Sequence, residues 1–135
     1  MSESLKLSIY SPERKLIEEL VVEEVILPGS EGQVQFLPGH TPMLGTLETG
    51  IFTYKTVTGT ETRGVVSTGF FEVLENKVAV MAETIELKGE IDVERAKRAQ
   101  KSAEETLRDA ELDEHKFKKY QLKLQRALIR QQLGE

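Results

Sequence analysis

Residues 27–50 read LPGSEGQVQFLPGHTPMLGTLETG, and this stretch decides how the first part of the chain folds. Five glycines and three prolines surround one short apolar run, QVQFL. Proline has a fixed φ and no amide donor, and glycine readily adopts positive φ, so such a stretch forms tight turns rather than a long helix. It holds one His, two Glu and no Cys, Lys or Arg. It therefore predicts a shaped docking surface that carries little chemistry.

Short strand-like segments surround this stretch and continue to residue 88. Leu5, Leu7 and Ile9 alternate with other residues in LKLSIY, as on one face of a strand. Further segments are LVVEEVIL, QVQFL, IFTYKTV, GVVS, FFEVL and KVAVMA. Turn signals separate them at Ser11-Pro12, Pro28-Gly29, Thr58-Gly59 and Glu75-Asn76. Residues 1–88 are predicted to form an antiparallel β-sandwich or flattened barrel.

Residues 89–135 have a helical pattern, without proline and with glycine only near the two ends. Apolar or small residues recur at steps of three or four, at Val93, Ala96, Ala99, Ala103, Leu107 and Ala110. A second stripe follows at Phe117, Tyr120, Leu124, Ala127 or Leu128, and Gln131. The segment LDEHK, residues 112–116, loses the pattern and is the expected turn. The chain is thus predicted to be α+β, with a C-terminal antiparallel two-helix hairpin.

The alanine-rich stripe has an energetic consequence. Burial contributes about 25 cal/mol per Å² of apolar surface, and alanine has little surface to bury. We therefore expect a weakly held hairpin that can detach, extend or dock elsewhere.

Composition excludes several classes of protein. The net charge of −5 and pI of about 5.2 argue against nucleic-acid partners. Cysteine is absent, so there is no disulfide framework and no thiolate metal site. No apolar run approaches the roughly 18 residues that span a bilayer, and the N-terminus lacks the apolar core of a signal peptide. We expect a soluble cytoplasmic protein without direct membrane insertion.

A search for catalytic constellations predicts none. The chain has no Gly-Lys-Ser/Thr phosphate loop, no dinucleotide glycine fingerprint and no Gly-x-Ser-x-Gly elbow. His40 and His115 stand 75 positions apart, and no third ligand accompanies them. We expect His40 to be a turn histidine bonded to nearby backbone, with a partner contact as the alternative, and His115 to be solvated. Neither a catalytic residue, a metal site nor an enzyme is predicted.

One motif, IDVERA at residues 91–96, indicates an anion site. Asp92 is a natural N-cap, and Arg95 stands where a capping box has Glu or Gln. Arg126 and Arg130, four apart, share one face of the second helix. If the hairpin folds back, these arginines can converge on a phosphate-bearing ligand, since their forked donors match phosphate oxygens.

The alternative is a solvated basic face at the start of the first helix. In that case Arg95 pairs with Glu94 or Glu90 and binds no ligand.

Three motifs together resemble a known family. They are PGSEGQVQFLPGHTPML at residues 28–44, TGFFEVLENKVAVMAETIE at 68–86 and IDVERA at 91–96. In this order, over roughly residues 5–130, the chain resembles the epsilon subunits of bacterial F-type ATP synthases. The resemblance implies the same fold and a non-catalytic rotor subunit of the central stalk. Such a subunit couples proton-driven rotation to ATP synthesis, as a peripheral protein on the cytoplasmic face of the plasma membrane.

The resemblance also implies partners. The sandwich would stand between the gamma subunit and the c-subunit ring. The turn Ser30, Glu31, Gly32 and Gln33 and the loop at His40 would face the ring or gamma. The helices would permit ATP hydrolysis when folded down and inhibit it when extended along gamma into the alpha/beta head.

A regulatory ATP site is implied as well, although no cofactor is required. Its residues would be Glu86, Ile91, Asp92, Arg95, Ala96, Arg126 and Arg130. Ser102 departs from the pattern, because ATP-binding members have a further arginine there. Losing one phosphate-facing cation would weaken binding by about 1–3 kcal/mol, or tenfold to a hundredfold.

Two other functions remain open from the sequence. One is a stand-alone ATP-binding sensor with a β-sandwich body. The other is an unrelated adaptor that shares only the turns.

Overall fold

The computed structural model describes residues 4–109 and 111–134. By contacts, the chain divides into two compact units, Met1–Leu87 and Lys88–Glu135. The division falls one residue before the boundary expected from the sequence.

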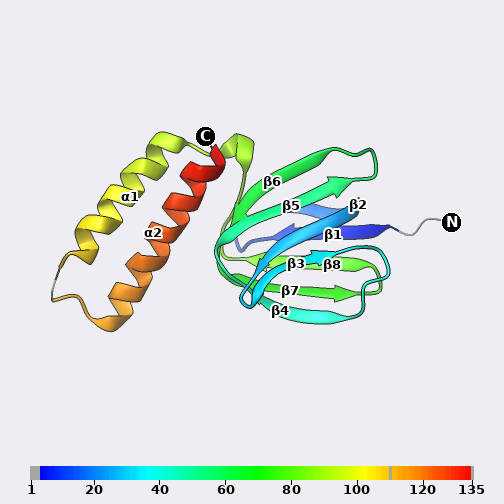
Figure 1. Cartoon of the computed structure of the whole chain (residues 1–135), viewed down its shortest axis with the longest axis horizontal. Coiled ribbons are helices and arrows are strands. Elements are labelled where there is room, and N and C mark those ends of the chain that lie inside the picture. Colours follow the sequence, from blue (N-terminus) through cyan, green and yellow to red (C-terminus); the bar gives the residue numbers. More distant parts are fainter. Residues whose placement is uncertain (1–3, 110, 135) are drawn as a thin grey trace. The chain divides into compact units, whose positions relative to one another are not determined.

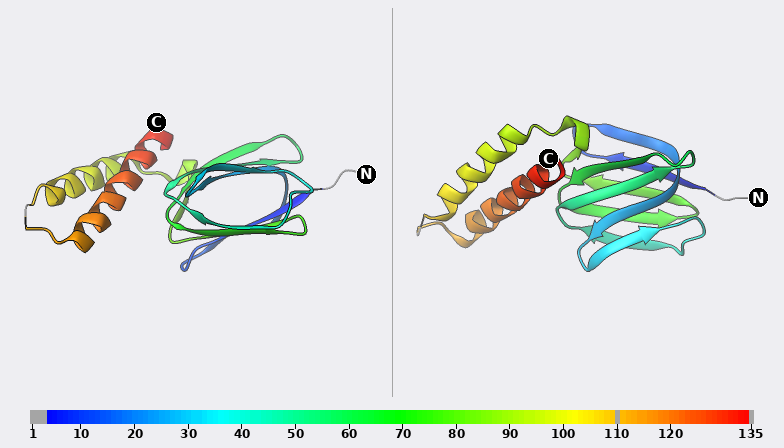
Figure 2. Two further views of the ribbon diagram at one scale, coloured as in Figure 1. Left: turned by 60° about the horizontal axis from the view of Figure 1, so that its bottom comes forward. Right: turned by 45° about the horizontal axis from the view of Figure 1, so that its top comes forward.

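The described part of the first unit is built from strands (Figures 1 and 2). They are β1 (Leu5–Tyr10), β2 (Lys15–Gly29), β3 (Gly32–Phe36), β4 (Met43–Leu47), β5 (Gly50–Thr56), β6 (Glu61–Val66), β7 (Gly69–Leu74), β8 (Lys77–Ala82) and β9 (Ile85–Leu87).

The strands pair in the order β1-β8-β7-β4-β2-β5-β6-β9, and β3 pairs with β2. The long β2 also pairs with β1, so the sheet closes on itself as a flattened barrel, which is visible edge-on in Figure 2. The predicted β-sandwich is therefore confirmed. One pairing differs from the antiparallel prediction, because β1 and β8 run parallel, with Leu7 opposite Val78. Nothing in the spacing of distant strands along a chain reveals such a pairing.

The core explains the alternation seen in the sequence. Leu5, Leu7 and Ile9 have no exposed surface, and Phe36, Phe52 and Phe71 are the largest fully buried side chains. Successive strand residues point to opposite faces, so these side chains meet between the layers.

The sequence pattern predicts neither β4, whose stretch glycine and proline punctuate, nor the three-residue β9. Two other strands begin earlier than predicted, β2 at Lys15 rather than Leu20 and β6 at Glu61 rather than Gly64. The turn expected at Pro28-Gly29 lies two residues later, at Ser30-Glu31, because Gly29 still pairs with Gly32.

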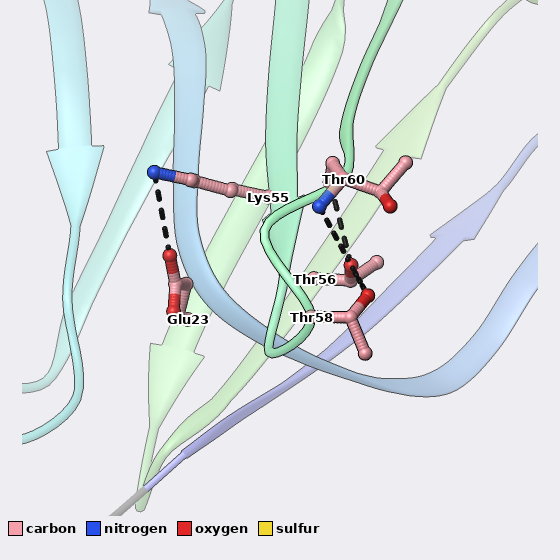
Figure 3. A network of polar contacts seen from close by, with 5 residues as sticks. All are labelled: Glu23, Lys55, Thr56, Thr58 and Thr60. Carbon is pink, nitrogen blue, oxygen red and sulfur yellow. Dashed lines mark hydrogen bonds and ion pairs between the residues drawn. The ribbon is translucent and has the colours of Figure 1, made fainter.

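The turn after β5 shows how side chains fix these connections (Figure 3). The Thr56 hydroxyl lies 2.9 Å from that of Thr58 and accepts from the Thr60 amide at 3.2 Å. Beside it, Lys55 on β5 pairs with Glu23 on β2 at 3.5 Å.

The described part of the second unit is a short 3-10 helix, η1 (Lys88–Glu90), followed by α1 (Val93–Leu107) and α2 (Glu114–Gly134), which form the predicted hairpin (Figure 1). Asp92 caps α1, as its side chain accepts from the Arg95 amide at 3.0 Å. The predicted turn at residues 112–116 is partly wrong. Asp113 accepts from the Lys116 amide at 2.8 Å, and α2 therefore begins at Glu114. Ala110 lies outside the described residues.

Few side chains are buried in this second unit. In its described residues the buried apolar set is Ala96, Ala103, Ala127 and Leu133. Of the two options left open for α2, Ala127 is buried and Leu128 is 45% exposed. Gln131 donates to Gln100 across the helices at 2.6 Å. Because the contact between the helices rests on three alanines, one leucine and one amide pair, it buries much less apolar surface than the sandwich core.

Candidate functional site

A groove of about 270 Å³ lies between α1 and α2. It is lined by Ala99, Ser102 and Ala103 from α1 and by Tyr120, Lys123, Arg126, Ala127 and Arg130 from α2. The residues from α1 are all small, so no long side chain from α1 fills the groove.

The groove is strongly basic. Lys123, Arg126 and Arg130 follow one another at steps of three and four, which places them along one edge of α2. Among the described residues that line the groove there is no carboxylate. Three cations along one edge of a groove attract a negatively charged ligand, and guanidinium groups match phosphate geometry.

The structure places the predicted phosphate residues in two regions of the hairpin. Arg126 and Arg130 line the groove, together with Ser102. The groove begins at Ala99, four residues after Arg95, so the IDVERA motif precedes it along α1.

The residues of that motif have mainly structural contacts. The Asp92 carboxylate caps α1, and Ala96 is fully buried. Ile91 lies against the end of α2, since a Cβ on Gly134 would approach its Cγ2 to 3.0 Å. The motif thus holds the two helix ends together.

Of the two carboxylates offered as partners of Arg95 in the alternative, Glu94 pairs with Lys97 at 3.6 Å, and Arg95 is exposed. Glu86 belongs to the other unit, where it is half-buried on β9 opposite Val65.

The predicted docking turn is a β2–β3 connection that is hydrogen-bonded to β4. The Ser30 amide donates to the Thr46 carbonyl at 3.0 Å, and the Thr46 hydroxyl donates to the Ser30 hydroxyl at 2.6 Å. Gly32 has a φ of +125°, which a side chain would strain. With Glu31, Gln33 and neighbouring residues of β4, this turn borders a groove of about 490 Å³.

The His40 loop is held from two sides. The His40 ring packs edge-on against Phe36 at 4.8 Å, and its Nδ1 donates to the Thr41 carbonyl at 2.6 Å. The Gly39 amide donates to the Asn76 side chain at 2.8 Å. The expected turn histidine bonded to nearby backbone is confirmed, and its contact with a partner stays a prediction.

The turn and the loop lie at opposite ends of β3. Ser30 and Glu31 precede this five-residue strand, and His40 follows it. A strand of that length spans roughly 15 Å. The two predicted contacts are therefore separate sites on the sandwich.

The sandwich has an apolar outer face that was not predicted from the sequence. Phe70 is 48% exposed, and across the sheet its neighbours are Met81 and then Tyr10. These three residues help to line a groove of about 440 Å³. Leu44, on the adjacent strand β4, is 71% exposed. The pair Phe70-Phe71 could have indicated this apolar face, because consecutive strand residues point to opposite faces and one ring must face outward.

Two features are absent from the described part of the chain. Residues 4–109 and 111–134 contain no group of three or more His, Cys, Asp or Glu side chains that could hold a metal ion. Neither helix, within those residues, is long and apolar enough to cross a membrane.

Comparison with known families gives two adjoining matches. Residues 4–88 match the β-sandwich domain of the ATP synthase delta/epsilon chain. Residues 90–133 match the long α-helix domain of the same chain.

Individual relatives match over nearly their full length. The ATP synthase epsilon chain of Trichlorobacter lovleyi is 41% identical over 134 residues, which are 99% of this chain and 96% of the relative. That of Geotalea daltonii is 40% identical with the same coverage.

Two solved structures share the fold. A chain of the Euglena gracilis mitochondrial ATP synthase aligns with a TM-score of 0.82 at 20% identity, covering 95% of this chain and 79% of that one. A chain of the Tetrahymena thermophila central stalk and c-ring structure has a TM-score of 0.64 at 10% identity, covering 99% and 100%.

Proposed function

The chain belongs to the ATP synthase delta/epsilon family, as a non-catalytic epsilon chain of the central stalk, and we propose that its hairpin senses ATP while its sandwich couples rotation. The basic groove between α1 and α2 is the observation that carries this proposal.

The groove has two properties that an ATP sensor needs. Its cations suit the phosphates of ATP, and its walls come from both helices, so a ligand there bridges α1 and α2. The folded hairpin is otherwise held by few buried side chains, among them Ala103 and Ala127. A bridging ligand therefore stabilises the folded form relative to the extended one.

The mechanism is a population shift. ATP favours the folded hairpin only by its differential affinity for that state. At one hundred times the dissociation constant this amounts to about 2.7 kcal/mol. With ATP bound the helices stay folded and hydrolysis is permitted; without ATP they extend along gamma into the alpha/beta head and inhibit it.

The sandwich has separate surfaces for separate partners. We assign the turn Ser30–Glu31–Gly32–Gln33 to the c-subunit ring. We assign the His40 loop and the apolar face around Phe70 to the contact with gamma, because exposed apolar patches of this kind mark protein interfaces. The protein would sit at the cytoplasmic face of the plasma membrane through these partners.

Two experiments test the proposal. Calorimetry of the full chain with ATP should give a binding isotherm, and no heat at millimolar ATP would remove the sensor. ATPase activity of the holoenzyme should rise when residues 89–135 are deleted, and unchanged activity would remove the inhibitory role and leave coupling.

The groove also favours a second candidate, a sensor that acts outside the complex. Co-purification with gamma separates the two functions. A stable complex with gamma is required of a stalk subunit and is not expected of a free-standing sensor.

A further inference from the structure

The basic groove contains a cation that the IDVERA motif and the arginine pair do not include. Lys123 lines the groove one turn before Arg126, together with Ser102 on α1. Its side chain is exposed, and within the described residues no carboxylate pairs with it. Its charge is therefore not neutralised by the residues around it.

Tyr120 gives this lysine a defined position. The Lys123 ammonium lies 4.9 Å from the centre of the Tyr120 ring, within cation–π range. Tyr120 lines the same groove. The ring therefore favours a position of the ammonium beside the groove, and the Lys119 ammonium lies farther from the same ring, at 6.0 Å.

Ser102, which lines the groove opposite α2, has a small side chain. Its side chain ends at a hydroxyl, so the groove stays open between α1 and the basic edge of α2. A long cationic side chain at position 102 would occupy this space. With serine there, a cation reaching in from α2 can take the same role.

We infer that Lys123, positioned by Tyr120, is a third phosphate-binding cation of the groove and compensates for the serine at position 102. This inference rests on the proposed ATP site and names a residue of that site. Three cations along one edge of α2 match a polyphosphate chain more closely than two arginines do, because each can bind a separate phosphate.

The test is calorimetry of the full chain with two probes, ATP and inorganic tripolyphosphate. Lys123→Gln should weaken the binding of both by about tenfold, and Lys123→Arg should retain it, because a charge-assisted hydrogen bond is lost only in the first. Lys118→Gln is the matched control, since Lys118 is an exposed lysine of α2 that does not line the groove. It should bind like the unmodified chain.

Two further variants test the positioning and the compensation. Tyr120→Leu should weaken ATP binding while Tyr120→Phe restores it, because only the aromatic face attracts the ammonium. Ser102→Arg should recover the affinity that Lys123→Gln loses.

The outcomes separate this inference from the proposed function. If the unmodified chain binds ATP and Lys123→Gln binds it equally well, the role of Lys123 is overturned and the ATP site stands. If the unmodified chain binds neither probe at millimolar concentration, the sensor function fails and the inference fails with it. A loss in Lys123→Gln and in Tyr120→Leu but not in Lys118→Gln, with helicity unchanged by circular dichroism, supports the inference.

Discussion

Asn76 shows how a single residue can place a docking loop. Its φ of +62° is in the left-handed region, and its side chain accepts from the Gly39 amide. Its carbonyl also accepts from the Lys6 amide at 2.9 Å. One residue in the turn between β7 and β8 therefore connects β1 with the loop that carries His40.

Replacing Asn76 with alanine should destabilise the sandwich by about 1–2 kcal/mol. The change removes the hydrogen bond to Gly39 and places a Cβ-bearing residue without local polar compensation at positive φ. Asn76→Gly removes the same bond without the strain and should cost less. Urea unfolding followed by circular dichroism measures both, and equal losses would refute the contribution of strain.

Gly45 shows a different constraint, that of close approach. A Cβ at this position on β4 would enter the ring of Phe71, which is fully buried. At Gly89 an added Cβ would meet nothing within 4 Å.

We therefore predict that Gly45→Ala destabilises the sandwich by about 1–3 kcal/mol through overpacking. The matched change Gly89→Ala should be neutral or slightly stabilising. Thermal unfolding of the two variants provides the comparison. A neutral Gly45→Ala would mean that the Phe71 ring moves aside freely.

At the scale of elements, the two kinds of secondary structure differ in what holds them. The strands enclose a continuous core that includes three phenylalanines, Phe36, Phe52 and Phe71. In the hairpin, the buried apolar residues described are three alanines and one leucine. Because stabilisation scales with buried apolar area, the helices should open before the sheet does.

Hydrogen exchange should show this difference directly. Amides of α1 and α2 should exchange at least tenfold faster than those of β5 and β7 in the isolated chain. Added ATP should slow exchange in the helices and leave the strands unchanged. Equal protection of helices and strands without ligand would contradict the weakly held hairpin.

The start of α2 depends on a cap that the hydrophobic pattern did not reveal. Asp113 accepts from the Lys116 amide and begins the helix before the apolar stripe starts at Phe117. Periodicity locates the buried face of a helix, whereas the first turn is set by backbone amides that need an acceptor.

On the scale of the whole molecule, the division after Leu87 separates a unit of strands from a unit of helices. All members of the main hydrophobic core lie before this point. The basic groove and its cations lie after it.

Removal of residues 88–135 should leave a sandwich that unfolds cooperatively and still binds gamma. Its core loses no member, so the unfolding midpoint should stay within a few degrees of that of the full chain. Differential scanning calorimetry and co-purification with gamma measure both properties. A truncated chain that fails to fold would show that the units depend on each other.

Local patterns in the sequence determined much of this protein. The alternation in LKLSIY and KVAVMA predicted β1 and β8 with their observed bounds, and the step of three or four predicted both helices. These patterns are reliable because the direction of a side chain follows from the backbone geometry of consecutive residues. The three motifs also identified the family.

Only the tertiary structure decided which of these elements meet. It made β1 and β8 parallel neighbours, separated the Ser30 turn from His40 by the length of β3, and turned Phe70 outward. It also brought Lys123 to the same groove as Ser102. Such contacts join residues far apart in the chain and depend on how whole faces pack, and no local period of the sequence records that.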